Sequence, residues 1–348
     1  MRDSGNLSMG RQAVHWYCGV VVLAAALLIF IGGLVTSKGA GMTVPDWPTS
    51  YGYNMFFFPI SRWVGGIFYE HVHRLVASAV GLLTVILTVW LLIVEPRFWV
   101  KVMGVIATAA VILQGVLGGL RVTMMKNQIG IFHGMLAQSF LVLLGILFIV
   151  TSNAFLRQQW ANFSFDLRLK NWALGATFLI FLQLGLGATM RHEHAGLSIP
   201  DFPRAYGKWW PPTDTQSITS INQQRVSENE MPTDAFQILL QMVHRLNALL
   251  VAIAVVAFTL LAFKPAAAPR TVRGWALVWI FLILCQITLG AWTIWSHKAA
   301  DVATAHVALG ALLLLLGSTL TFRLFCASHF GFPVLHGNSQ PDMMRASA

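Results

Sequence analysis

The stretch "EHVHRLVASAVGLLTVILTVWLLIV", residues 70–94, places acidic, basic and imidazole side chains directly before a run of twenty residues without charge. Twenty residues in an α-helix rise about 30 Å, which matches the hydrocarbon thickness of a bilayer. The run therefore predicts a helix that crosses a membrane. The polar head of the stretch then lies where this helix enters the bilayer, a place where ionisable side chains are costly and usually functional.

The rest of the chain repeats this kind of run. The 348 residues are 56% hydrophobic and 10% charged, whereas soluble domains are about 25% charged. Eight runs carry no charged side chain, namely 12–37, 75–94, 102–120, 127–156, 171–190, 246–263, 274–297 and 302–322. Lipid requires internally hydrogen-bonded backbone, and the runs lack the alternation of barrel strands. We therefore expect an all-α polytopic membrane protein with eight transmembrane helices.

The basic residues indicate an orientation in the membrane. The formal charge is +10, but the Lys and Arg residues are spread over short loops and helix ends, so lipid headgroups are expected as partners and nucleic acid is not. With both termini inside, 12 basic residues lie on the inner side and 9 outside, four of these in the long loop 191–235. Long loops count for less in the positive-inside rule. The first run is also too long for a signal peptide. We expect a multi-pass protein of a bacterial plasma membrane with cytoplasmic termini.

Cysteine usage adds no metal or disulfide framework. Cys18, Cys285 and Cys326 have no close spacing, and none lies in an expected outer loop. The sequence therefore gives no indication of a zinc site or a disulfide.

The sequence contains an internal duplication. Residues 33–52, "GLVTSKGAGMTVPDWPTSYG", align with residues 188–207, "ATMRHEHAGLSIPDFPRAYG". Farther along, "HVHRLVA" at 71–77 aligns with "MVHRLNA" at 242–248. The two proline-containing loops are expected either to cover pockets or to anchor aromatic side chains at the membrane interface.

The duplication divides the chain into two halves. The N-terminal half is residues 1–157, and the C-terminal half is residues 158–348 with a polar and mobile outer-loop insertion near 213–234. A repeat with an even number of spans keeps its orientation in the membrane. We therefore expect two tandem four-helix bundles related by a pseudo-twofold axis along the membrane normal.

Four histidines recur at matching positions of the two halves. His73 matches His244, and His133 matches His306. All four fall near the expected outer starts of their helices, so they share one depth. Two imidazoles that face each other from neighbouring helices can clamp an iron porphyrin, so each half predicts one pair of heme ligands. A histidine that only makes hydrogen bonds at the interface is the alternative for any one of them.

Two arginines follow the first histidine of each pair. Arg74 comes directly after His73, and Arg245 after His244. Heme propionates near the water boundary need positive partners, so both arginines are candidate propionate contacts. Alternatively, both extend to lipid headgroups.

The two halves differ at the position three residues before that histidine. It is Glu70 in the first half and Gln241 in the second. Residues three apart share a helix face, and a carboxylate can move protons or stabilise positive charge where an amide only makes hydrogen bonds. The first half is therefore expected to perform chemistry and the second to hold a fixed heme, unless Glu70 only complements the helix dipole. His71 lies off this face and is expected to be solvated.

Taken together, these residues resemble the heme A synthase family over nearly the whole chain. The resemblance is carried by the duplicated halves and by "GGLVTSKGAG" (32–41), "EHVHR" (70–74), "FHG" (132–134), "VHR" (243–245) and "AH" (305–306). Each motif alone is weak, and the set is specific.

The resemblance implies an oxidoreductase that converts the C8 methyl of heme O to a formyl group and supplies heme A for terminal oxidases. By this resemblance His244 and His306 would ligate a permanent heme b. His73 and His133 would line the heme O site, with Glu70 beside the reacting region. Successive hydroxylation of the methyl followed by loss of water is the expected chemistry. The electron donor is not readable from the sequence, and a contact with heme O synthase and a homo-oligomer are both open.

The chain departs from part of the family in its first outer loop. Some bacterial members carry two cysteines there, and the corresponding residues are Thr43 and Ser50. A loop disulfide is therefore excluded. The chain is closer to the cysteine-lacking members, whose loop carries the pair seen at Asp46 and Trp47.

Two other functions are left open by the histidine pattern. One is a diheme membrane cytochrome that transfers electrons, although such cytochromes often place two ligands on each of two helices. The other is a heme carrier for oxidase assembly, which would not need Glu70.

Overall fold

The computed structural model of the protein describes residues 9–156 and 165–330. Within these ranges eight helices are long and apolar enough to cross a membrane. They are α1 (Met9–Ser37), α2 (Gly65–Val94), α3 (Phe98–Thr123), α4 (Asn127–Val150), α6 (Leu167–His192), α8 (Ala235–Ala262), α9 (Arg270–Trp295) and α10 (Ala300–Phe330). The predicted all-α polytopic class is confirmed.

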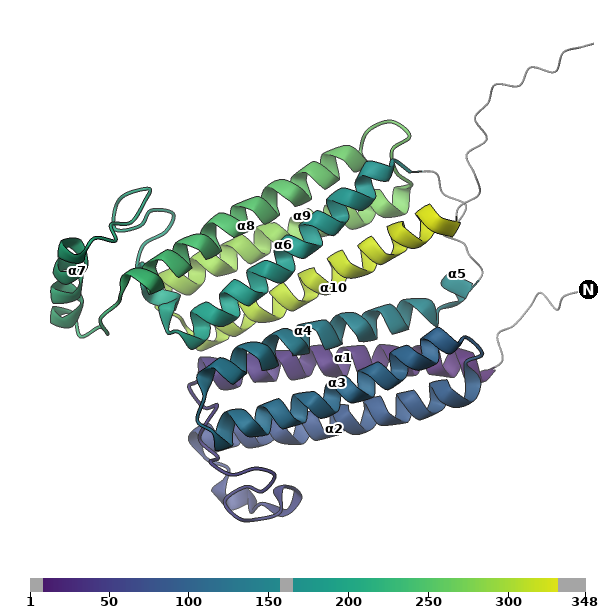
Figure 1. The fold of residues 1–348 in the computed structure, drawn as a ribbon, viewed down its shortest axis with the longest axis horizontal. Helices are drawn as coiled ribbons and strands as arrows, with labels where there is room; N and C mark the ends of the chain where they lie inside the picture. Colours follow the sequence, from purple (N-terminus) through teal and green to yellow (C-terminus); the bar gives the residue numbers. More distant parts are fainter. Residues whose placement is uncertain (1–8, 157–164, 331–348) are drawn as a thin grey trace, which may run out of the picture.

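The helices gather in two groups of four, which lie beside each other in Figure 1. In the first group α1 contacts α2 and α4, and α3 contacts α2 and α4. In the second group α6 contacts α8 and α10, and α9 contacts α8 and α10. The groups meet through contacts of α10 with α1 and α4 and of α4 with α6. The predicted boundary between the halves, at 157/158, lies outside the described residues.

Each group has its own apolar core. Leu87 of α2 and Leu144 of α4 are fully buried in the first core, and Phe258 of α8 and Trp279 of α9 in the second. Large apolar side chains also cover the outward faces, as at Ile93, which is 75% exposed. In water such a surface would be unfavourable, whereas in lipid it costs nothing, because the hydrophobic effect no longer acts on it.

The connections lie at two ends of the helices. The loop before α2 and the short helix α7 (Thr215–Ser227) lie at one end, and α5 (Asn153–Leu156) and the start of α1 lie at the other (Figure 1). Helices α2, α4, α8 and α10 therefore all begin at the end that carries α7. We call this the histidine end, because all four predicted ligands are near it.

The polar insertion near 213–234 was expected to be a mobile loop, and it instead contains the helix α7. Asp214 caps this helix by accepting a hydrogen bond from the Ser217 N–H at 2.9 Å. Arg225 near its other end donates to the carbonyl of Leu197 at 3.1 Å and pairs with Glu230 at 3.2 Å. A polar helix without an apolar stripe is hard to recognise from sequence.

Candidate functional site

The four predicted ligand histidines lie about two turns inside α2, α4, α8 and α10, at one depth from the histidine end. His133 is close enough to His73 to act on its charge, and His306 acts on His244 in the same way. The two predicted pairs are therefore neighbours in the structure, each within one group of helices.

Each histidine ring lies against a glycine of the preceding long helix. A Cβ added to Gly32 of α1 would lie 3.0 Å from Cε1 of His73, and the equivalent distance from Gly187 of α6 to His244 is 3.2 Å. Gly118 of α3 and Gly290 of α9 give 3.4 Å to His133 and 3.1 Å to His306. A side chain at Gly32, Gly187 or Gly290 would press on the ring, whereas the distance at Gly118 corresponds to an ordinary van der Waals contact.

We call this contact with a glycine the glycine seat. One nitrogen of each ring is buried in the structure. The Nδ1 atoms of His73, His133, His244 and His306 are buried and have no hydrogen-bond partner among the described residues. The residues themselves are only half-buried. Because Nδ1 of each ring is buried, Nε2 is the ring nitrogen left for a ligand contact, and it is a common metal-binding atom of histidine.

Three of the four histidines are also braced through their backbone. The Nε2 amides of Gln114, Gln183 and Gln286 each donate to the carbonyl of the histidine on the next helix, all at 3.0 Å. In the duplication, the position on α1 that matches Gln183 is Leu28, which cannot donate. The peptide of His73 thus lacks the brace that its counterpart His244 has.

These residues fit an iron porphyrin. In the part of the chain that the structure describes, no group of three or more His, Cys, Asp or Glu side chains can hold a metal ion. Two paired imidazoles alone suit a metal that brings its own equatorial ligands, as porphyrin iron does. The buried Nδ1 atoms leave Nε2 as the one ligand atom that each ring can offer to the iron.

Filling one glycine seat should remove the porphyrin from that site. Replacing Gly187 by leucine should lower the porphyrin content by up to one equivalent per polypeptide, that of the His244 site, because the new side chain would occupy the place of the His244 ring. The measurement is porphyrin per polypeptide in the purified protein. Gly175→Leu is the matched control, since Gly175 is exposed on the same helix with nothing within 4 Å of an added Cβ. Full porphyrin content in Gly187→Leu would show that the seat is unimportant.

The side chains of Glu70 and Gln241 bind matching backbone positions in the two duplicated proline-containing loops. Oε2 of Glu70 accepts hydrogen bonds from the Thr43 and Val44 N–H groups at 2.7 and 2.9 Å. Oε1 of Gln241 accepts one from Ile199 at 2.6 Å, and Ile199 matches Val44 in the duplication. Both side chains are buried. The structure thus gives Glu70 a structural contact that an amide also provides.

Arg74 and Arg245 fasten the same loops. Arg74 donates to the Glu70 carboxylate at 2.8 Å and, with its two terminal nitrogens, to three backbone carbonyl groups. These belong to Val44, Asp46 and Thr49, at 2.8, 2.7 and 3.0 Å. Arg245 donates to the carbonyls of Asp201 and Arg204, both at 2.8 Å. The contacts of Arg74 occupy all four of its terminal N–H groups. No observation tests a propionate contact of Arg74 or Arg245, and both contacts stay predictions.

In each loop, an aspartate side chain accepts hydrogen bonds from backbone N–H groups of the same loop. Asp46 accepts from the N–H groups of Tyr51 and Gly52 at 2.7 and 2.8 Å, and Asp201 accepts from Tyr206 and Gly207 at the same two distances. Partial burial would raise the pKa of Asp46, but the hydrogen bonds donated by Gly52, Thr49 and Tyr51 lower it below its ordinary value. The repeated "PD" and "YG" pairs therefore encode one loop conformation made twice.

Removing this carboxylate should loosen the first loop. In Asp46→Ala the Tyr51 and Gly52 amides should exchange hydrogen at least about tenfold faster, because charged hydrogen bonds contribute about 1.5–3 kcal/mol. Since the folded pKa is lowered, the wild-type loop should be tight above the ordinary pKa of aspartate and loosen as the pH falls through the folded pKa. Hydrogen exchange followed by mass spectrometry measures both. Asp214→Ala, in the cap of α7, is the control and should leave exchange in the first loop unchanged. If Tyr51 and Gly52 exchanged as slowly in Asp46→Ala as in the wild type, Asp46 would not hold the loop.

The prediction that His71 is solvated is wrong. His71 is fully buried, and its Nδ1 lies 3.3 Å from the Ser50 hydroxyl. Its ring packs against Phe58 and Trp63 with centroids 5.0 and 4.7 Å apart. The loop folds back over this position, which Met242 fills in the second half. His71 is therefore part of the loop support and not of the porphyrin site.

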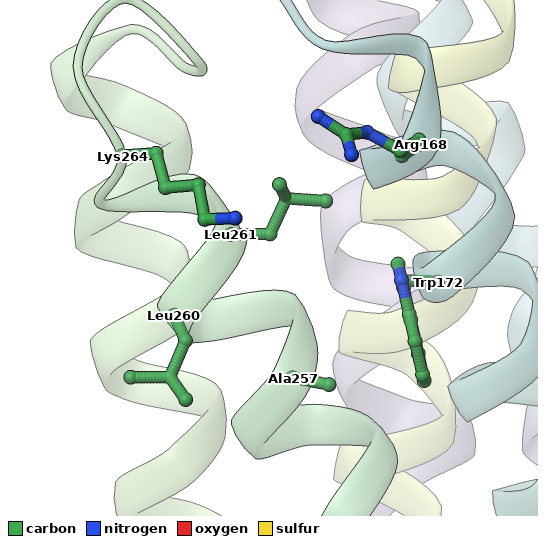
Figure 2. A pocket seen from close by; sticks show the side chains of 6 residues that line it. All are labelled: Arg168, Trp172, Ala257, Leu260, Leu261 and Lys264. Atoms are coloured by element: carbon green, nitrogen blue, oxygen red, sulfur yellow. The ribbon is translucent and has the colours of Figure 1, made fainter.

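A groove at the opposite end of the second group is separate from these sites. Figure 2 shows it between α6 and α8, with a volume of about 340 Å³ and with Arg168, Trp172 and Lys264 among its lining side chains. Arg168 precedes Gly187 on α6 by about 28 Å of helix. The groove therefore does not contact the histidines.

Comparison with known proteins identifies relatives of this chain. A family model described as cytochrome oxidase assembly protein (COX15-CtaA) matches residues 53–317. The chain is similar to Heme A synthase of Geobacillus kaustophilus, with 25% identity over 312 residues that cover 85% of this chain and 86% of that protein. It is also similar to Heme A synthase of Shewanella oneidensis, with 23% identity over 335 residues that cover 89% and 96%. For Heme A synthase of Shouchella clausii the identity is 26%, and the coverage 81% and 87%.

The family match spans most of the chain and includes all four histidines. The chain therefore belongs to this family of cytochrome oxidase assembly proteins, the heme A synthase family.

Proposed function

We propose that this chain is a heme A synthase, an oxidoreductase that oxidises the C8 methyl of heme O to a formyl group. The family and the relatives named Heme A synthase support this activity. The structural observation that carries it is the repeated contact of one imidazole on each of α2, α4, α8 and α10 with a glycine of the preceding long helix, which leaves Nδ1 of each ring buried. Such paired imidazoles suit two iron porphyrins, one as substrate and one as cofactor.

The two halves are proposed to divide the work. His73 and His133 would hold heme O as substrate in the N-terminal half, and His244 and His306 would hold heme b in the C-terminal half. When bound, heme b would supply one-electron transfer. Two differences support this division. Glu70 stands where the second half has an amide, and the peptide of His73 lacks the glutamine brace of its counterpart, which suits a ligand that must enter and leave.

Glu70 is proposed to act on the substrate as well as on the loop. It lies one turn before His73 on α2, and Arg74 and the loop N–H groups fix its carboxylate. A carboxylate fixed beside the reacting methyl stabilises positive charge that develops there, without having to reorganise. Gln241 has no charge to offer at the equivalent place.

The orientation is proposed from the basic residues. We place both termini in the cytoplasm and the histidine end on the outer side, with the halves as tandem bundles related by a pseudo-twofold axis along the membrane normal. The duplicated loop contacts support the relation between the halves. A reporter that is active only outside the cytoplasm, fused after the last residue, should stay inactive. Activity there would reverse the orientation.

Conversion of heme O tests the function directly. The protein should be produced together with a heme O producing enzyme, purified, and its extracted hemes separated and quantified. Heme A should form in the wild type and should be lost when His73 or His133 is replaced by alanine. Heme O left unconverted by a folded, heme-containing wild type would favour the electron carrier or the heme carrier instead.

A further inference from the structure

A group of basic side chains lies at the histidine end where the two halves meet. We call it the basic cluster, and it consists of Arg121 at the end of α3, Arg191 and His192 at the end of α6, and Lys298 between α9 and α10. All four are half-buried. The positive charge of Arg191 acts on Arg121, His192 and Lys298, so the cluster is electrostatically one unit.

Close backbone contacts fix the position of Arg121. A Cβ added to Gly41 would lie 3.0 to 3.3 Å from Nη2, Nη1 and Cζ of Arg121, so the guanidinium lies flat on the first loop at this glycine. A Cβ added to Gly130 of α4 would lie 3.1 Å from Nε of Arg121 and 2.7 Å from Nε2 of His192. Arg121 is thus held between the first loop and the first turn of α4, which carries His133.

The cluster has no acidic partner of its own. The ion pairs among the described residues are Arg74–Glu70, Arg97–Glu95, Arg168–Asp166 and Arg225–Glu230. Glu70 is the acid that acts on Arg121, but its carboxylate is already occupied by Arg74 and the loop. The Nε atoms of Arg121 and Arg191 are buried without a hydrogen-bond partner among the described residues. Burying unpaired charge is costly, so such a cluster favours a bound anion.

The cluster borders both porphyrin sites. Arg121 lies against Gly130, which is three residues before His133 on α4, and Arg191 binds next to Gly32, the glycine that contacts the His73 ring. Arg191 also donates to the Gly33 carbonyl at 2.8 Å and the Ser37 hydroxyl at 2.6 Å, which ties α6 to α1 between the sites. Burial, followed by the nearby Arg191, lowers the pKa of Lys298 below its ordinary value.

On the basis of the proposed function, we infer that the basic cluster binds the propionate carboxylates, with Arg121 as the positioning residue for the porphyrin held by His73 and His133. The porphyrin edge that carries the propionates must face polar surroundings, and the cluster is a half-buried group of cations without an acidic partner of its own at the histidine end. Arg74 has no terminal N–H group left for this task. The planar guanidinium of Arg121 can bind a carboxylate through two parallel hydrogen bonds.

The experiment compares two ligands that differ only in charge at this edge. The full-length protein, depleted of heme and placed in nanodiscs of phosphatidylcholine in phosphate-free buffer, is titrated with iron protoporphyrin IX and with its dimethyl ester. The wild type should bind the diacid about tenfold to a hundredfold more tightly than the diester, which is the range for charge-assisted hydrogen bonds. In Arg121→Gln the preference at the site of His73 and His133 should fall several-fold, through weaker binding of the diacid alone, and Arg121→Lys should retain part of it.

The diester is an internal control for folding, because it needs the imidazoles and not Arg121. Lys126→Gln, which removes an exposed cation beside α4, should keep the full preference. The inference is overturned if Arg121→Gln weakens both ligands equally or leaves the preference intact. It is also overturned if the preference arises only after acidic lipid or phosphate is added. A wild type that converts heme O but binds both ligands equally would refute this inference alone, whereas a wild type that binds neither would refute the proposed function.

Discussion

Replacing Glu70 by glutamine should nearly abolish heme A formation while the protein stays folded and keeps its bound heme b. The reason is that Gln241 already shows an amide holding the equivalent loop position through the Ile199 N–H. Glu70→Gln can therefore keep a loop contact of this kind, while it removes the negative charge and with it the ion pair to Arg74. A positioned carboxylate contributes about 10² to 10⁴ in rate, so we expect heme A per polypeptide to fall at least about a hundredfold. Extracted hemes and thermal unfolding should be measured on the same preparation.

Two companion variants separate the chemical role of Glu70 from its structural one. Glu70→Ala removes both and should lower the unfolding temperature as well as the activity. Gln241→Glu, the reverse exchange in the second half, should leave heme A formation largely unchanged. If Glu70→Gln retained full activity while Glu70→Ala lost it, the carboxylate would be a loop support and the proposed chemical role would be wrong.

Replacing His244 by alanine should strip heme b from the C-terminal half. A bis-imidazole heme that loses one ligand changes spin state and loses most of its binding energy, so the low-spin spectrum of heme b should disappear. His306→Ala should have the same effect, because both imidazoles hold one iron. His73→Ala should leave that spectrum intact and abolish heme A formation. Optical spectra of the purified variants, recorded with the heme content, measure these changes.

His71→Met is the matched control for the histidine variants. It removes an imidazole two residues from His73 and supplies the side chain that Met242 provides in the second half. It should therefore keep both heme content and activity. If the heme b spectrum survived His244→Ala and was lost in His73→Ala, the assignment of the two halves would be reversed.

The sequence could predict the helices and the four histidines because their signals are long or repeated. Runs such as 75–94 are long enough to identify a span individually, and the match of His133 to His306 follows from the duplication. The loops were predicted less well. They were expected to cover pockets or to anchor aromatic side chains, but the hydrogen bonds that Asp46 accepts from the Tyr51 and Gly52 N–H groups became visible only in the fold.

The features that the sequence missed depend on contacts between distant segments. Gly32 and Gly187 match in the duplication, but nothing in the sequence relates either glycine to a particular imidazole. Arg121 and Arg191 have no basic counterparts, since the matching residues are Thr293 and Thr36. The duplication therefore gave no reason to select them. Arg74 and Arg245 were chosen because they repeat in the two halves. Repetition shows that a position matters, but it does not distinguish a contact with a loop from a contact with a ligand.

The two alternative functions, an electron carrier and a heme carrier, explain the differences between the halves less well. A carrier of electrons needs two fixed hemes and gives no reason for Leu28 where the other half has Gln183. A heme carrier needs release but gives no reason for the fixed carboxylate of Glu70. The asymmetry of the two halves favours one exchanging site and one permanent site.

The proposed function requires paired imidazoles that hold iron. The decisive measurement is the electron paramagnetic resonance and Soret spectrum of the purified oxidised protein, produced with ample porphyrin, in the wild type and in the His244→Ala and His306→Ala variants. The wild type should show a low-spin ferric signal of bis-imidazole type, and both variants should lose it. A wild type without Soret absorption, or a low-spin signal that survives in both variants and in His73→Ala and His133→Ala, would contradict the proposed function.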